Sequence, residues 1–108
     1  EHIYPLESFI LELKRVLRPE GIFVGAFPAE GGLAWGLGRF LTSRRWVNKN
    51  TSVDLDKIIC WDHPNYSDHI IDTLQNHFQQ IMISYWPLSW IRLIDLNLVV
   101  KFKCKNKK

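Results

Sequence analysis

The chain has 108 residues, enough for a single domain, and 46% of them are hydrophobic while 23% are charged. This balance is typical of a packed globular chain and excludes an intrinsically disordered one. The formal charge is +3, but five lysines lie within the last eight residues. We therefore interpret residues 101–108 as a solvated basic tail and expect no nucleic-acid partner.

Further classes are excluded by what the sequence lacks. Cys60 and Cys104 are not spaced as metal ligands and give no reason to expect a disulfide, which favours a reduced, cytoplasmic setting. No run approaches the ~20 apolar residues that span a bilayer, and no secretory signal opens the chain, so no membrane partner is expected. The chain begins at Glu1 and enters a helix almost at once, and from this we expect a piece of a longer protein.

The first predicted elements are a helix over residues 6–17 and a strand over residues 22–27. Apolar residues recur at helical spacing along the first segment, and Pro19 and Gly21 end it. Residues 22–27 contain no charged or strongly polar side chain, which is typical of a strand buried on both faces. In open α/β sheets, sites form just beyond the carboxyl ends of such strands, so we expect the functional site there.

Residues 28–66 show no regular period over most of their length, and we interpret them as a long cap inserted after the strand. Residues 33–41 are compatible with a short helix or a turn-rich segment. Residues 54–61 are compatible with either a short helix or an extended segment. Because the cap follows the carboxyl end of the strand, we expect it to cover the substrate.

A second long helix is predicted to begin at Ser67, whose side chain can cap it. Alternation predicts strands over residues 81–86 and 94–102, and the short connection between them favours an antiparallel pair. Three strands make only a partial sheet. The predicted fold is therefore α/β, one half of a doubly wound domain, with a central buried strand, a final antiparallel strand pair and a long cap insertion.

Residues 12–21, ELKRVLRPEG, resemble the E-x-x-R-V-L-K-P-G-G segment of class I S-adenosylmethionine-dependent methyltransferases, in particular the type 11-like group. Glu1-His2-Ile3 is similar to the E-H-I that precedes this helix in many of them. The resemblance implies that residues 1–108 are the carboxyl-terminal part of a Rossmann-like methyltransferase domain. Its missing partner would be the amino-terminal half of the same domain. One departure is Glu20, where the family usually has glycine.

The resemblance also implies what this chain lacks. The family's glycine-rich loop, which cradles S-adenosylmethionine, is not in the sequence, and neither is the acidic residue that binds the ribose hydroxyls. Gly31-Gly32 and Gly36-x-Gly38 are not substitutes, because they follow a later strand and we expect no strand–glycine loop–helix order around them. The chain is therefore expected to hold at most the edge of the cofactor site.

Candidate site residues lie in the entry segment and in the cap. The resemblance implies that the entry segment lies near the cofactor, which makes His2 a candidate wall of that pocket. His63 is the candidate general base, because imidazole exchanges protons near neutral pH. Guanidinium groups can bind a carboxylate or phosphate, and indole rings can stack on a planar acceptor. The substrate-binding candidates are Glu30, Arg39, Arg44, Arg45, Trp46 and Trp61.

Each of these residues also has a structural alternative: a packed helix-entry histidine, a solvated surface charge or a core aromatic. No metal is predicted, since no His, Cys, Asp or Glu cluster has metal-ligand spacing. Two functions remain open. One is methyl transfer from S-adenosylmethionine to a small-molecule acceptor, with this chain supplying the substrate side. The other is a non-catalytic half-domain that acts as a protein-interaction module through exposed aromatic residues.

Overall fold

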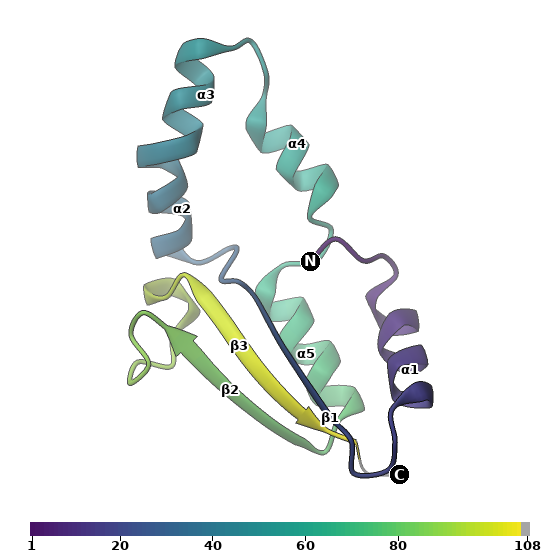
Figure 1. The fold of residues 1–108 in the computed structure, drawn as a ribbon. Helices are drawn as coiled ribbons and strands as arrows, with labels where there is room; N and C mark the ends of the chain where they lie inside the picture. Colours follow the sequence, from purple (N-terminus) through teal and green to yellow (C-terminus); the bar gives the residue numbers. More distant parts are fainter. Residues whose placement is uncertain (107–108) are drawn as a thin grey trace.

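A computed structural model describes residues 1–106 and shows a mixed α/β fold (Figure 1). The predicted helices beginning at residues 6 and 67 and the predicted strands at 22–27 and 81–86 are confirmed to within one residue at their starts. The elements in chain order are α1 (Leu6–Val16), β1 (Ile22–Pro28), α2 (Leu33–Arg39), a π-helical segment (Phe40–Arg44), α3 (Arg45–Asn50), α4 (Leu55–Asp62), α5 (Ser67–His77), β2 (Gln80–Trp86), a 3-10 turn (Ile94–Leu96) and β3 (Val99–Lys105).

The three strands form one antiparallel sheet in the order β1-β3-β2, so the last strand lies between the two earlier ones. The predicted antiparallel pairing of the two final strands is confirmed. The prediction of a central strand buried on both faces is wrong for β1, which lies at an edge of the sheet. Ile22 and Val24 of this strand are 52% and 63% exposed. Their apolar character suggested burial, but in the described chain helices cover only the opposite face.

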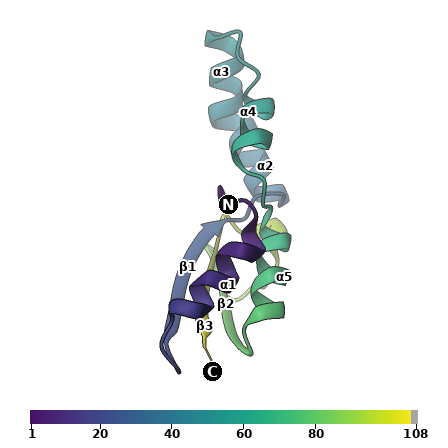
Figure 2. The same cartoon turned by 90° about the vertical axis from the view of Figure 1, so that its right-hand side faces the viewer.

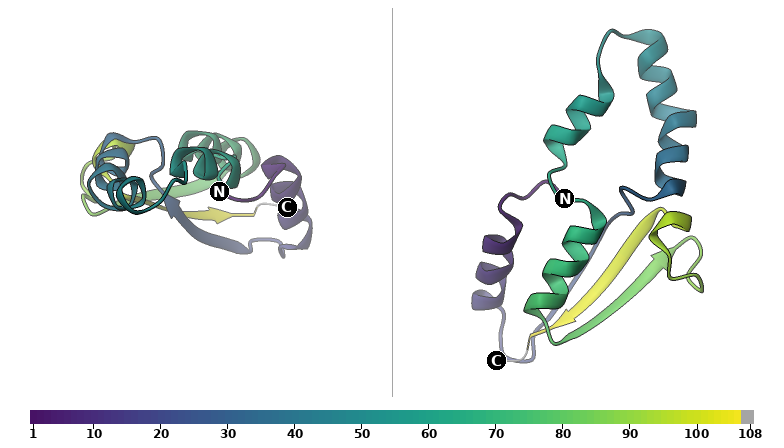
Figure 3. Two further views of the ribbon diagram at one scale, coloured as in Figure 1. Left: turned by 90° about the horizontal axis from the view of Figure 1, so that it is seen from above. Right: turned by 180° about the vertical axis from the view of Figure 1, so that it is seen from behind.

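Helices α1 and α5 lie side by side on one face of the sheet (Figures 2 and 3). Ile10 of α1 and Leu74 of α5 are 2% and 1% exposed and pack against Phe27 of β1 and Val100 of β3. Burial of apolar surface between these two layers is the main favourable contribution to the stability of the fold. We call α1, α5 and the sheet the body.

The prediction of a solvated basic tail over residues 101–108 is wrong for the residues that form the middle strand β3. Lys101, Lys103 and Lys105 belong to this strand, where they alternate with apolar residues such as Val100 and Cys104, both fully buried. Because successive side chains of a strand point to opposite faces, the lysines lie on the face that no helix covers. Their charges hydrate that face. Residues 107–108, the rest of the predicted tail, lie outside the described residues.

The strand predicted over residues 94–102 begins only at Val99, because Ile94–Leu96 forms a 3-10 turn. The buried side chain of Asn97 explains the difference. It accepts one backbone N–H and donates to two backbone carbonyl oxygens within the connection 87–93. This side chain closes the connection between β2 and β3, so the chain pairs as a strand only after it.

The turn between α1 and β1 contains Glu20 with φ of 61°, in the left-handed region that favours glycine. The backbone N–H of Glu20 donates to the carbonyl oxygen of Asn106 at 2.9 Å, and the N–H of Asn106 donates to the carbonyl oxygen of Gly21 at 2.9 Å. These two bonds hold the turn against the end of β3. The glycine found here in the resembled segment would adopt the same conformation with less strain.

Residues 33–62 form a helical arm, which runs outward along α2, the π-helical segment and α3 and returns along α4 (Figures 1 and 2). Of the two alternatives left open for residues 33–41, the structure shows the helix, which continues through the π-helical segment to residue 50, and the undecided segment 54–61 is also helical. The arm begins at the carboxyl end of β1, where the cap was predicted. It extends away from the sheet, however, and does not fold over the end of the strand.

Candidate functional site

Five polar side chains meet beyond the carboxyl end of β1, where the sequence predicted a site. Figure 1 shows that the helical arm begins at this end of the strand. They come from the entry segment, from the loop after β1 and from the end of α4. Three of them were predicted as site residues, the two histidines and Glu30. We call the group the histidine cluster, and its members are Glu1, His2, Glu30, Asp62 and His63.

Asn65 places the entry segment against the end of α4. Its side-chain Nδ2 donates to the carbonyl oxygens of Glu1 at 3.2 Å and Ile3 at 2.6 Å, and the residue is only 2% exposed. His2 lies between these two anchored residues, so its ring is held beside that of His63, with the centroids 4.4 Å apart and the planes at 83°. The sequence indicated only a loop at Asn65, because nothing local signals a contact with the start of the chain.

His63 and Glu30 form the most buried pair of the cluster. Nδ1 of His63 lies 2.7 Å from Oε2 of Glu30, and the two side chains are 17% and 5% exposed. A carboxylate only accepts hydrogen bonds, so Nδ1 carries the hydrogen, and in the neutral ring Nε2 has the lone pair. Glu30 is fixed in turn, because Oγ of Ser67 donates to its backbone carbonyl oxygen at 2.5 Å. The neutral His63 ring therefore has one defined tautomer.

His2 has the same tautomer for a similar reason. Its Nδ1 lies 2.7 Å from the backbone carbonyl oxygen of Asp62, which can only accept a hydrogen bond. Its Nε2 lies 3.3 Å from a carboxylate oxygen of Glu1, and Nε2 of His63 lies 3.8 Å from one of Asp62. Each neutral histidine thus presents a lone pair toward a carboxylate, an arrangement that a cation would stabilise.

Tyr66 and Cys60 form a second pair close to the cluster. Tyr66 occupies the cap position of α5, so the predicted cap role of Ser67 is wrong; the Ser67 hydroxyl binds the loop after β1 instead. Sγ of Cys60 lies 3.9 Å from the Tyr66 hydroxyl, and hydrogen bonding to this thiol raises the pKa of Tyr66. The charge of Cys60, burial and the carboxylate of Glu30 raise it further. The Tyr66 hydroxyl is therefore a donor at neutral pH, not a base.

Arg39 and Arg44, predicted to bind substrate, both form ion pairs with Asp56 of α4 within the arm. A carboxylate oxygen of Asp56 lies 2.7 Å from Nη2 of Arg39, and the other lies 2.8 Å from Nη2 of Arg44. The two ion pairs connect the outgoing and returning sides of the arm. Nε of Arg39 and Nε1 of Trp35, one helical turn apart, are buried without a hydrogen-bond partner within residues 1–106. A buried donor without a partner costs free energy, and a polar ligand that accepts its hydrogen bond would remove that cost. The sequence analysis did not single out Trp35.

Arg45, Trp46 and Trp61 do not join the cluster. Arg45 and Trp46 belong to α3, which lies toward the tip of the arm (Figure 1). They line a shallow hollow together with Lys49. Trp46 is 64% exposed, and Trp61 on α4 is 81% exposed. In the described chain these three predicted site residues are surface side chains.

The glycine pair after β1 differs from the prediction in one respect. Gly31 and Gly32 lie between β1 and α2, so the strand–glycine loop–helix order that we did not expect is present. The loop is nevertheless closed: a Cβ on Gly32 would lie 2.7 Å from the carbonyl oxygen of Ile94. The N–H of Leu33 at the start of α2 already binds Oδ1 of Asp95 at 3.2 Å. This carboxylate occupies the position that a phosphate would need.

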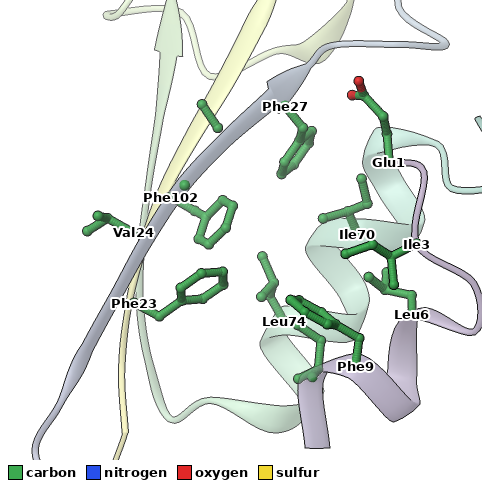
Figure 4. Close-up of a pocket in the computed structure, with 13 residues that line it drawn as sticks. Glu1, Ile3, Leu6, Phe9, Phe23, Val24, Phe27, Ile70, Leu74 and Phe102 are labelled. Atoms are coloured by element: carbon green, nitrogen blue, oxygen red, sulfur yellow. The ribbon is translucent and has the colours of Figure 1, made fainter. Parts of the chain in front are cut away.

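An apolar groove of about 250 Å³ lies between α1 and β1 on the helix-covered side of the sheet (Figure 4). Phe9 of α1 and Phe23 and Phe27 of β1 line it, with Leu74 of α5 at its floor. Glu1 lies at the end near Phe27, so the groove approaches the histidine cluster. The groove also borders the edge of β1 that is not paired with β3.

No helix within residues 1–106 is both long enough and apolar enough to cross a bilayer. Comparison of the chain with protein-family models, with curated proteins and with solved structures finds no match. The resemblance to methyltransferases therefore rests on the motif in residues 1–27, and the functional argument rests on the geometry of the histidine cluster.

Proposed function

We propose that this chain supplies the acceptor side of an S-adenosylmethionine-dependent methyltransferase that acts on a small molecule. The observation that carries the proposal is the Glu30–His63 pair beside His2 at the carboxyl end of β1. The resembled segment leads directly into this strand, and the resemblance implies that cofactor and acceptor meet beyond its end. The long insertion followed by an antiparallel strand pair also supports the carboxyl half of a Rossmann-like methyltransferase sheet.

In this proposal His63 takes the proton of the acceptor. An oxygen or nitrogen acceptor loses a proton when it is methylated, and a base within hydrogen-bond reach promotes that step. The carboxylate of Glu30 holds the Nδ1–H of His63, which leaves Nε2 to receive the proton and stabilises the imidazolium that forms. The unpartnered donors of Trp35 and Arg39 are available to bind a polar group of the acceptor.

The described residues do not fit the whole cofactor. The glycine loop at Gly31–Gly32 is closed by backbone packing and by the carboxylate of Asp95. We therefore assign acceptor-side roles alone to this chain and infer that an amino-terminal half of the same domain binds S-adenosylmethionine. The unpaired edge of β1 and the apolar groove beside it form a surface on which that half would continue the sheet.

Calorimetric titration with S-adenosylmethionine tests the proposal. We expect no measurable binding to this chain alone and clear binding to a chain extended at its amino end by the upstream coding sequence. In the extended protein, His63→Ala should lower methyl transfer roughly 100-fold, whereas His69→Ala, an exposed control on α5, should not. Binding to this chain alone, or full activity of His63→Ala, would show that the assignment is wrong.

A protein-interaction module is the second candidate, and the exposed apolar side chains favour it. The arm exposes Leu33 and Trp61 at 73% and 81%, and the uncovered face of the sheet exposes Val24 and Met82 at 63% and 70%. Exposed apolar side chains of this size become interaction sites where they gather into a patch that a partner covers. If the extended protein neither binds S-adenosylmethionine nor transfers methyl groups, this candidate replaces the enzyme.

A further inference from the structure

We infer that the histidine cluster binds a divalent transition-metal ion, of which zinc is the best match. One ligand atom from each of Glu1, His2 and His63 lies within 4.8 Å of the other two. Two imidazoles and one carboxylate form a ligand set that zinc takes at sites with an open position. Zinc bonds of 2.0–2.2 Å at tetrahedral angles place ligand atoms about 3.4 Å apart. The three ligand atoms would therefore have to approach one another by about 1 Å, and His2, whose side chain is 54% exposed, is the most accessible of the three residues.

The hydrogen bonds of both histidines prepare the same ring atom as a ligand. Nδ1 of His63 donates to the buried carboxylate of Glu30, and Nδ1 of His2 donates to the backbone carbonyl oxygen of Asp62, each at 2.7 Å. Histidines that bind metals in proteins characteristically donate their other ring N–H to a carboxylate or a backbone carbonyl. Both kinds of acceptor are present here, so each Nε2 is oriented and has a lone pair to offer.

The charges in the cluster also favour a divalent cation. Glu1, Glu30 and Asp62 bring three carboxylates to two imidazoles, and no Lys or Arg side chain of residues 1–106 forms an ion pair with any of the three. A single divalent ion bound between the two rings compensates the negative charge of these carboxylates.

The metal site goes beyond the proposed function and does not depend on it. It uses Nε2 of His63, the atom that would act as the general base, so metal binding and proton transfer exclude each other on one molecule. Metal binding can be measured on this chain without any methyl transfer. A negative result for one proposal therefore leaves the other standing.

Calorimetric titration of zinc chloride into the chain at neutral pH tests the inference. We expect one ion per chain with a micromolar or tighter dissociation constant, weakening as the pH is lowered because protons compete for the imidazoles. His2→Ala should weaken binding at least tenfold, and the His2 side chain is 54% exposed, so its removal leaves the body intact. Glu30→Gln, which alters only the group that orients His63, should weaken binding by roughly 10–100-fold.

The chain has four histidines, so the other two provide matched controls. His69→Ala and His77→Ala should bind zinc as the unmodified chain does. Cobalt gives a second readout, because tetrahedral Co²⁺ absorbs visible light strongly and His2→Ala should abolish that spectrum. An absence of binding at submillimolar zinc would overturn the inference. So would an unchanged affinity in His2→Ala, or an equal loss in His69→Ala.

Discussion

The body and the helical arm are held together by different forces. The buried hydrophobic residues of the described chain all lie in the body or immediately beside its elements, whereas no helix within residues 33–62 has a buried residue. The arm relies instead on ion pairs, such as those of Asp56 with Arg39 and Arg44. Burial of apolar surface contributes ~25 cal/mol per Å², while exposed ion pairs typically contribute less than about 1 kcal/mol. The body should therefore determine global stability, and the arm should open locally at lower cost.

A pair of leucine substitutions gives the largest expected contrast between the two regions. Leu74→Ala removes a side chain that is 1% exposed in the body and should lower the free energy of unfolding by about 3 kcal/mol. Leu37→Ala removes a side chain that is 59% exposed in the arm and should change it by less than about 0.5 kcal/mol. Urea denaturation followed by circular dichroism measures both. Similar losses for the two variants would show that the arm is packed more tightly than its exposure indicates.

The two cysteines allow the body and the arm to be compared by thiol reactivity, because Cys104 lies in the body and Cys60 in the arm. Burial raises the pKa of Cys104 from its ordinary value of 9.0 to about 11, which lowers its thiolate fraction near neutral pH roughly 100-fold. Alkylation of the folded protein, followed by peptide mass spectrometry, should label the exposed Cys60 first. Cys104 should react only at the rate of unfolding. Equal labelling of both thiols would contradict a closed body.

The raised pKa of Cys104 also has a consequence for stability. The unfolded chain loses this thiol proton at lower pH than the folded chain does, so the stabilising contribution is complete below pH 9.0 and is lost as the pH rises through about 11. The free energy of unfolding should therefore fall over that range. In Cys104→Ala the fall should be smaller.

Asn65 lies between α4 of the arm and α5 of the body and binds the entry segment, and its removal should have a smaller effect on stability. Asn65→Ala leaves the carbonyl oxygens of Glu1 and Ile3 without their donor and should cost about 1–2 kcal/mol. Because the entry segment is then released, zinc affinity should fall as in His2→Ala. Asn48→Ala, an exposed asparagine on α3, is the control. Retention of full zinc affinity in Asn65→Ala would show that His2 is held by other contacts.

Local patterns in the sequence predicted most of the body. Helical spacing located α1 and the start of α5, and the apolar run located β1. The errors arose where a long-range neighbour decides the environment. The apolar character of Ile22 and Val24 says nothing about how many faces of β1 are covered, and a run of lysines has the same composition in a tail as in a middle strand. Residues 100–105 do alternate between apolar and lysine side chains, as a strand does, but the number of lysines favoured the interpretation as a tail.

The sequence predicted where the histidine cluster lies but did not predict all of its members. The rule for strand ends directed attention to the segment after β1, and His2, Glu30 and His63 were chosen as candidates for their chemistry. Their meeting depends on Asn65, which bonds the first residues of the chain to the segment before α5. Metal-ligand spacing along the sequence could not indicate this cluster, because His2 and Asp62 are 60 positions apart.

The sequence by itself determined the secondary structure of the body and the chemistry available beyond β1, because periodicity and side-chain type are local properties. The tertiary structure alone decided that β3 lies in the middle of the sheet, that the segment after β1 is an extended arm, and that two histidines share one tautomer. Those outcomes depend on contacts between distant segments. Hydrogen bonds from Asn65, Ser67 and Asn97 to backbone carbonyls hold the entry segment, the loop after β1 and the connection before β3, and such bonds leave no periodic pattern in the sequence.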